Sequence, residues 1–250
     1  MRKIPRMLAA GALTALMVLG SLAFSRFPGI ESDHKKVAEA RNDSLKASGS
    51  VKVDLPSPHP QLSAALYQLA VNGYNKLSAT QKLSRQLLTI VDFSKPSSEK
   101  RLFIIDMATQ KVLLYTLVAH GRNSGEKMAT RFSNLDATHQ SSLGFYVTGG
   151  TYIGGNGYSL RLKGLERGFN DKAESRAIVM HGAPYVSEQV VKSTGRLGRS
   201  WGCPAVSQQE HKKIIDLIKG GSCLFIYAPQ TEYLTASSLL KENASQSGSL

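Results

Sequence analysis

The sequence predicts a mainly β domain with a few peripheral helices. Short apolar or alternating runs recur along the chain, and each is bounded by turn-forming residues, which is typical of strands. These runs occupy residues 87–91, 101–105, 112–118, 144–148, 158–162, 177–180 and 223–227. The glycine-rich stretch 154–157 joins two of them; it lacks the lysine and the following helix of a phosphate-binding loop, so it is interpreted as a turn.

Two segments show helical spacing instead. Apolar residues recur at helical spacing from Leu62 to about Leu77, which predicts an amphipathic helix packed on the β domain. Ser207 and Glu210 have the spacing of a capping box, and the apolar residues within 214–218 then predict a helix that ends at Gly220-Gly221.

The first 23 residues have the composition of an export signal. Arg2, Lys3 and Arg6 precede an uncharged apolar run over residues 7–22, and Ser21-Leu22-Ala23 is a small-x-small cleavage site. We expect cleavage after Ala23 and export to the periplasm or cell envelope. The alternative is an uncleaved membrane anchor, although the run is shorter than the roughly 18 apolar residues of a credible transmembrane helix.

Composition divides the rest of the chain into four segments. Residues 24–60 contain charged residues, Ser and Pro, and their apolar residues follow neither helical nor strand spacing. The prolines of 56–60 cannot continue a helix, so a linker is expected. A helical extension over 61–86 and the β domain over 87–229 follow. Residues 230–250 contain few large apolar side chains, and we expect this tail to be peripheral.

The chain is strongly basic, with a formal net charge of +13 that falls to +10 when the three cations of the signal segment are removed. This balance favours polyanionic surroundings such as nucleic acid, anionic lipid or an acidic cell-wall polymer. Export and the scattered placement of the cations argue against nucleic acid. A membrane partner is expected only if the signal segment is retained.

One histidine and one cysteine have the setting that nucleophilic cysteine chemistry requires. His181 follows the apolar run 177–180, and Cys203 lies in a loop between Gly202 and Pro204. A thiol with a pKa of about 8.5 is little ionised at neutral pH, so a neighbouring imidazole is needed to remove its proton. Gly202 lets the backbone turn its amides toward an attacked carbonyl. Ser200 is a candidate to hydrogen-bond within the loop or to orient His181.

A structural disulfide is the main alternative for Cys203. Two cysteines in an exported chain commonly pair. Cys223, however, lies in an apolar run where cysteine usually behaves as a small buried side chain. Because the chain has neither Cys-x-x-Cys nor His-x-x-x-His, we expect no metal and no other cofactor.

The other histidines give weaker signals. His120 follows a predicted strand and opens a polar loop, so it borders the active cleft or is a solvated loop residue. His139 and His211 have no partner pattern and are expected at the surface.

The segment around Cys203 resembles the signature of the L,D-transpeptidase catalytic domain of bacterial cell-wall enzymes. That signature is a strand-end His-Gly followed downstream by Ser-x-Gly-Cys, present here as His181-Gly182 and Ser200-Trp201-Gly202-Cys203. Residues 198–205 resemble the Gly-Arg-Ser-x-Gly-Cys-Pro-Ala motif of the murein L,D-transpeptidase branch. Residues 118–125, 132–134 and 142–146 are also similar to that branch, and the resemblance extends over roughly 87–227.

The resemblance implies an L,D-transpeptidase-type β-sandwich or barrel-like domain that acts on peptidoglycan stem peptides. It implies that the Cys203 thiolate attacks the carbonyl of the third residue of a stem tetrapeptide, and that His181 protonates the departing D-alanine. An acceptor amine would then take the thioester and form a cross-link. Water as the acceptor would make the same site an L,D-carboxypeptidase, and the sequence leaves both outcomes open.

The chain departs from the broader superfamily beside the cysteine. Relatives commonly have a histidine and an arginine at the positions of Trp201 and Ala205. Arg199 and Arg196 are therefore candidate substitutes for binding substrate, together with His120. Gly182 and Trp201 are further candidates for orienting the catalytic groups or for the oxyanion site. Trp201 either lines the pocket or packs within the loop.

Two other classes of function remain open at this point. One is a non-catalytic wall-binding domain with a structural disulfide. The other is a cysteine peptidase that cleaves ordinary L-peptide bonds and resists carbapenems, which are expected to acylate an L,D-transpeptidase cysteine.

Overall fold

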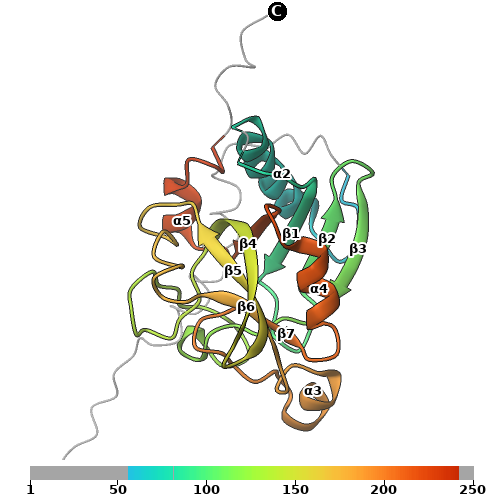
Figure 1. The fold of residues 1–250 in the computed structure, drawn as a ribbon, viewed down its shortest axis with the longest axis vertical. Helices are drawn as coiled ribbons and strands as arrows, with labels where there is room; N and C mark the ends of the chain where they lie inside the picture. Colours follow the sequence, from blue (N-terminus) through green and yellow to red (C-terminus); the bar gives the residue numbers. More distant parts are fainter. Residues whose placement is uncertain (1–55, 81, 242–250) are drawn as a thin grey trace, which may run out of the picture. The chain divides into compact units, whose positions relative to one another are not determined.

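The computed structural model describes residues 56–80 and 82–241, and in them eight strands form one mixed sheet accompanied by four α-helices (Figure 1). The strands are β1 Leu87–Asp92, β2 Leu102–Asp106, β3 Lys111–Thr116, β4 Gly144–Gly154, β5 Gly157–Gly164, β6 Val179–Ala183, β7 Ala205–Ser207 and β8 Cys223–Tyr227. The prediction of a mainly β domain is therefore confirmed. The predicted signal segment, most of the predicted linker and the end of the tail lie outside the described residues.

The strand order in the sheet is β3-β2-β1-β8-β4-β5-β6-β7. The β1–β8 and β6–β7 pairs are parallel, and the other neighbours are antiparallel. The glycine-rich stretch does form the tight turn between β4 and β5, where Gly154 is paired with Gly157.

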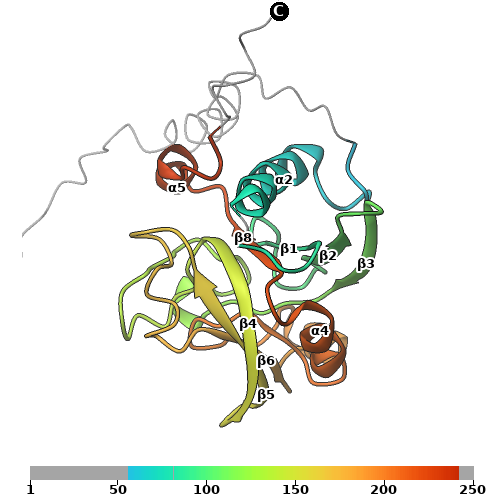
Figure 2. The ribbon, with the colours of Figure 1, turned by 45° about the horizontal axis from the view of Figure 1, so that its top comes forward.

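The chain beyond β3 brings the two edges of the sheet together. Ala119 is bridged to Ala205 of β7, and Gly121 to Ser200. Because β3 and β7 are the two edge strands, these bridges curl the sheet toward closure, as in a barrel. In Figure 2, β1 to β3 form one side and β4 to β6 the other, with β8 between them.

Helix α2 (Ala64–Ala79) covers the centre of the sheet. It begins at Ser63, whose hydroxyl accepts a hydrogen bond from the amide of Leu66. The helix packs on β1, and every residue of β1 and β8 is buried. Gly73 faces the ring of Phe145, where a Cβ would lie 2.1 Å from the ring, so the close approach of helix and sheet requires glycine. The predicted amphipathic helix is thus part of the core.

Three short elements around the cysteine differ from the sequence prediction. Helix α4 (His211–Ile218) packs on β5 and β6 but starts later than the capping-box pattern suggests. Ser207 and Glu210 do form the expected hydrogen bond, 3.2 Å from amide to hydroxyl, across a turn that precedes the helix. Strand β7 and helix α3 (Glu188–Thr194) were not predicted.

The expectation that the tail is peripheral is wrong for its described part. Helix α5 (Thr231–Ala236) buries Tyr233, and Leu240 beyond it is also buried. The carboxylate of Glu166 accepts hydrogen bonds from the hydroxyls of Tyr233 and Ser237 and thereby anchors this segment. No helix in the described part of the chain combines the length and the apolar character needed to cross a bilayer.

Candidate active site

The parallel pairing of β6 with β7 places His181 and Cys203 on adjacent segments of the sheet. His181 is in register with Ala205, so Cys203, two residues earlier, lies beside Val179. The Val179 amide donates to Sγ of Cys203 over 3.5 Å. Residues 179 and 181 project to the same face of β6, and strand geometry places the Cα atoms of His181 and Cys203 about 8 Å apart. Side chains on one face at that separation can meet.

His181 is held as a neutral base. It is buried within β6 rather than at the end of the strand, and its Nδ1 lies 3.0 Å from the carbonyl oxygen of Gly182. Because a carbonyl only accepts, Nδ1 carries the proton and Nε2 keeps its lone pair. Burial lowers the pKa of His181, and the nearby His211 lowers it further. Gly182 therefore orients the imidazole through its carbonyl group.

His211 is not the simple surface residue that was expected. It is half-buried at the start of α4, and its ring packs against Gly182, where a Cβ would lie 2.7 Å from Cγ of His211. The absence of a side chain at residue 182 thus makes room for the second histidine behind His181.

Both cysteines are free thiols. Burial raises the pKa of Cys203, whereas the Val179 amide and the positive charge of Arg176 act in the opposite direction. Cys223 is fully buried in β8, four positions from β7 in the sheet, which is about 19 Å along the sheet at ordinary strand spacing. A disulfide needs Cα atoms within about 7 Å. The structure therefore contradicts the disulfide alternative.

Ser200 and Gly202 shape the cysteine loop. The Ser200 hydroxyl accepts from the Gly202 amide at 3.1 Å and donates to the Cys203 carbonyl at 2.6 Å. It therefore holds the loop and does not orient His181. Gly202 has φ +119, and a Cβ there would lie 2.8 Å from the carbonyl oxygen of Gln140. Because the Gly202 amide is already bonded to Ser200, it has no N–H left for an oxyanion.

Three chain segments meet tightly beneath this loop. The Ser141 hydroxyl accepts from the Gly121 amide and donates to the Gly202 carbonyl, both at 3.0 Å. A Cβ on Gly121 would lie 2.5 Å from the carbonyl oxygen of His139. Glycine at 121 and 202 thus allows residues near 121, 140 and 202 to approach closely.

Arg176 is a part of the site that sequence reasoning missed. Its guanidinium donates to the carbonyl oxygens of Ser133 at 2.8 Å and Gln140 at 2.9 Å, and to the hydroxyl of Ser142 at 2.5 Å. The following residue, Ala177, has φ +53, and its carbonyl oxygen lies 3.7 Å from Sγ of Cys203. The only sequence signal was that this arginine directly precedes the strand that carries His181.

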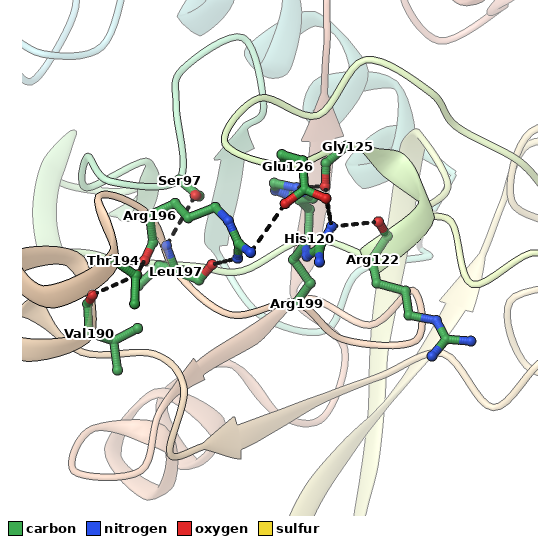
Figure 3. A network of polar contacts seen from close by, with 10 residues as sticks. All are labelled: Ser97, His120, Arg122, Gly125, Glu126, Val190, Thr194, Arg196, Leu197 and Arg199. Atoms are coloured by element: carbon green, nitrogen blue, oxygen red, sulfur yellow. Dashed lines mark hydrogen bonds and ion pairs between the residues drawn. The ribbon is translucent and has the colours of Figure 1, made fainter.

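Arg196 and Arg199 converge on one carboxylate. Nη1 of Arg199 is 2.5 Å from Oε1 of Glu126, and Nη2 of Arg196 is 3.1 Å from Oε2. Figure 3 shows both guanidinium groups directed at Glu126, while the side chain of Arg122 points away from it. The Glu126 side chain is 70% exposed. The two predicted arginines therefore lie together and already hold a carboxylate.

His120 does not line a cleft. Its ring is fully buried, and Nη2 of Arg101 donates to Nδ1 at 2.8 Å. Nε2 then carries the proton and lies 3.2 Å from the carbonyl oxygen of Gly125. Burial and the charge of Arg101 lower the pKa of His120 to about 4. With both nitrogens engaged inside the fold, His120 has no atom to offer a substrate.

Trp201 is 70% exposed and therefore does not pack the loop. The ring of His139 stacks on it with a centroid distance of 5.1 Å, and Nη2 of Arg122 is 2.9 Å from Nδ1 of His139. His139 lies at the surface, as expected, but it has partners in Trp201 and Arg122.

The sequence of this domain places it in a known family. The sequence profile of the L,D-transpeptidase catalytic domain matches residues 58–227, and the chain belongs to that family. The resemblance seen in the His-Gly and Ser-x-Gly-Cys motifs is thus confirmed.

Solved structures are similar at low sequence identity. The L,D-transpeptidase from Mycobacterium smegmatis is 14% identical, with 57% of this chain and 59% of that chain covered and a TM-score of 0.36. L,D-transpeptidase 3 from Mycobacterium tuberculosis is 10% identical, with 57% and 61% covered and a TM-score of 0.36. This chain therefore spans less than two thirds of those structures. No curated protein is significantly similar in sequence.

Proposed function

We propose that this chain is a peptidoglycan L,D-transpeptidase that uses Cys203 as the nucleophile and His181 as the general base. The proposal is supported by the β6–β7 register, which puts the free thiol of Cys203 and the imidazole of His181 on adjacent segments in a domain of this family. The proposed donor is a stem tetrapeptide, and the proposed place of action is the cell envelope.

The proposed reaction has two half-reactions. Nε2 of His181 takes the proton of the Cys203 thiol, and the sulfur forms a bond to the carbonyl carbon of the third stem residue. The bond from that carbon to the nitrogen of the terminal D-alanine then breaks, and His181 returns the proton to the departing amine. An acceptor amine next attacks the thioester, gives its proton to His181 and releases the thiol.

The surroundings of the pair favour this route. Because burial raises the pKa of Cys203 and lowers that of His181, thiol and imidazole are both neutral before the reaction. Proton transfer then accompanies attack. The Val179 amide and the charge of Arg176 stabilise the sulfur as it becomes anionic.

We propose that Arg196 and Arg199 hold a carboxylate of the stem peptide. They already bind one carboxylate, that of Glu126, from both sides. Arginine recognises carboxylates through paired donors, and an exposed side chain such as Glu126 can leave at small cost. Arg199 is four residues from Cys203 in the chain, so the proposed carboxylate site belongs to the same loop as the proposed nucleophile.

The test is incubation of the purified protein with a disaccharide-tetrapeptide, followed by mass analysis of the products. A dimer with loss of D-alanine identifies transpeptidation, whereas a tripeptide product identifies the L,D-carboxypeptidase alternative. Cys203→Ala and His181→Ala should each abolish both products. Turnover by Cys203→Ala, or cleavage only of ordinary L-peptide bonds, would contradict the proposal.

A further inference from the structure

The only tryptophan in the chain lies exposed two residues before Cys203. Together with His139 and Arg122 it forms a cluster that we call the Trp201 platform. An indole gains more from burial than almost any other side chain, so one held 70% exposed forgoes a large stabilisation. An indole combines a flat apolar face with one N–H donor, so an exposed indole can bind a ligand that has both apolar and polar groups.

His139 and Arg122 both lie against the indole, which nevertheless stays 70% exposed. The ring of His139 lies against it at an interplanar angle of 27°, and Cζ of Arg122 is 5.7 Å from the indole centroid. Arg122 donates to Nδ1 of His139, so these two groups form one unit. With most of its surface still exposed, the indole presents an apolar face beside unused N–H donors of Arg122 and His139.

The backbone holds the platform in place. The Arg122 amide donates to the Ser200 carbonyl at 2.8 Å, and the side-chain amide of Asn123 donates to the Thr138 carbonyl, also at 2.8 Å. His139 has φ +53, a conformation that residues other than glycine seldom adopt. Strained backbone of this kind persists where the surroundings enforce it, often at functional sites. The platform is therefore organised before any ligand arrives, which lowers the cost of binding.

We propose that the Trp201 platform binds a pyranose ring of the peptidoglycan glycan strand. This inference rests on the proposed function, because the stem peptide of that substrate is attached to an amino sugar. One face of a pyranose is a flat array of C–H groups that stacks on an indole. The hydroxyl and acetamide oxygens at its rim are neutral acceptors, which match the donors of Arg122 and His139.

The arrangement of the arginines favours a sugar over a stem-peptide carboxylate at this place. Figure 3 shows the Arg122 side chain directed away from Glu126, on which Arg196 and Arg199 converge. The Arg122 side chain is thus not part of the cluster that Arg196 and Arg199 form with Glu126. In the substrate, two stem residues lie between the sugar and the residue whose carbonyl is attacked, and this stretch spans about 10 Å when extended. In the protein, the Cα atoms of residues 201 and 203 are at most about 7 Å apart.

The direct test uses the tryptophan as its own reporter. Because Trp201 is the only tryptophan, the emission of the full chain carrying Cys203→Ser reports on the platform alone. Titration with a β-1,4-linked tetramer of N-acetylglucosamine should shift or quench this emission to saturation. By calorimetry, Trp201→Ala should weaken binding about tenfold, whereas Trp201→Phe should retain most of it. Ile153→Ala removes an equally exposed apolar side chain from the β4–β5 hairpin and should bind like the parent.

Kinetics separates this inference from the proposed function. The preference of the enzyme for a disaccharide-tetrapeptide over the sugar-free tetrapeptide, measured as a ratio of kcat/KM, should fall about tenfold in Trp201→Ala. Equal losses on both substrates would overturn the inference. Unchanged emission with the tetramer, or the same change with the sugar-free tetrapeptide, would also overturn it. If neither substrate is turned over, the proposed function is refuted. The emission and calorimetry measurements still test whether the Trp201 platform binds a sugar.

Discussion

Buried His120 should make the stability of this protein fall steeply in mild acid. In the folded state its pKa is lowered to about 4, because the ring is buried and faces Arg101. In the unfolded chain a histidine has a pKa of about 6.5. Below that pH, His120 binds a proton in the unfolded chain but stays unprotonated in the folded protein. The contribution of His120 is therefore complete above about pH 6.5 and is lost as the pH falls toward 4.

The size of the effect follows from the difference between the two pKa values. A difference of about 2.5 units, at 1.36 kcal/mol per unit, amounts to roughly 3 kcal/mol by pH 4. That is a large fraction of the stability of an ordinary domain. The Ser200 amide donates to the His120 carbonyl, so loss of this region also loosens the cysteine loop.

The assay is urea unfolding at steps from pH 7 to pH 4 for the wild-type protein and His120→Asn. The asparagine oxygen keeps an acceptor for Arg101 but does not titrate. Glu166 and other groups titrate in both proteins, so the difference between the two curves isolates His120. His139→Asn is the matched control for the loss of one histidine. If His120→Asn loses as much stability as the wild type on acidification, the reasoning is refuted.

Three further predictions concern the site. Gly202→Ala should cost about 1–3 kcal/mol of stability and lower turnover at least tenfold, because residue 202 has a positive φ and the new Cβ would clash with the Gln140 carbonyl oxygen. The control is Gly155→Ala, whose new Cβ would have no atom within 4 Å. This variant should behave as wild type in thermal unfolding and muropeptide assays. Arg176→Gln should move the pH profile of Cys203 alkylation to higher pH, since the charge of Arg176 lowers the thiol pKa; an unmoved profile would refute that role. Glu126→Gln should lower KM for the tetrapeptide several-fold by weakening the internal competitor for the arginine pair, and a raised KM would count against substrate exchange at Glu126.

The elements with strong local periodicity could be predicted from the sequence. The apolar runs that became β1, β2, β3 and β8 are near their predicted positions, because burial on the sheet dictates their side chains directly. Strand β7 has only three residues, and α3 buries none of its side chains, so neither leaves a pattern in the sequence. The tail was misjudged because it is held partly by hydrogen bonds to one buried carboxylate, Glu166.

The site residues, too, could be predicted only where a local sequence pattern exists. The motif around His181 and Cys203 predicted the family of the domain, and the β6–β7 register places the two residues on adjacent segments. The partners of the other candidates depend on which loops meet in space. Glu126 pairs with Arg196 and Arg199, and Arg101 with His120, across separations that no local pattern reveals.

The nucleophile itself is tested most directly by intact-mass analysis after incubation with a carbapenem. We expect a single adduct on the wild-type protein that is lost in Cys203→Ala. The adduct should remain in Cys223→Ala, because that second free thiol is fully buried in β8. An adduct that persists in Cys203→Ala, or the absence of any adduct on the folded wild-type protein, would contradict the assignment of Cys203 as the nucleophile.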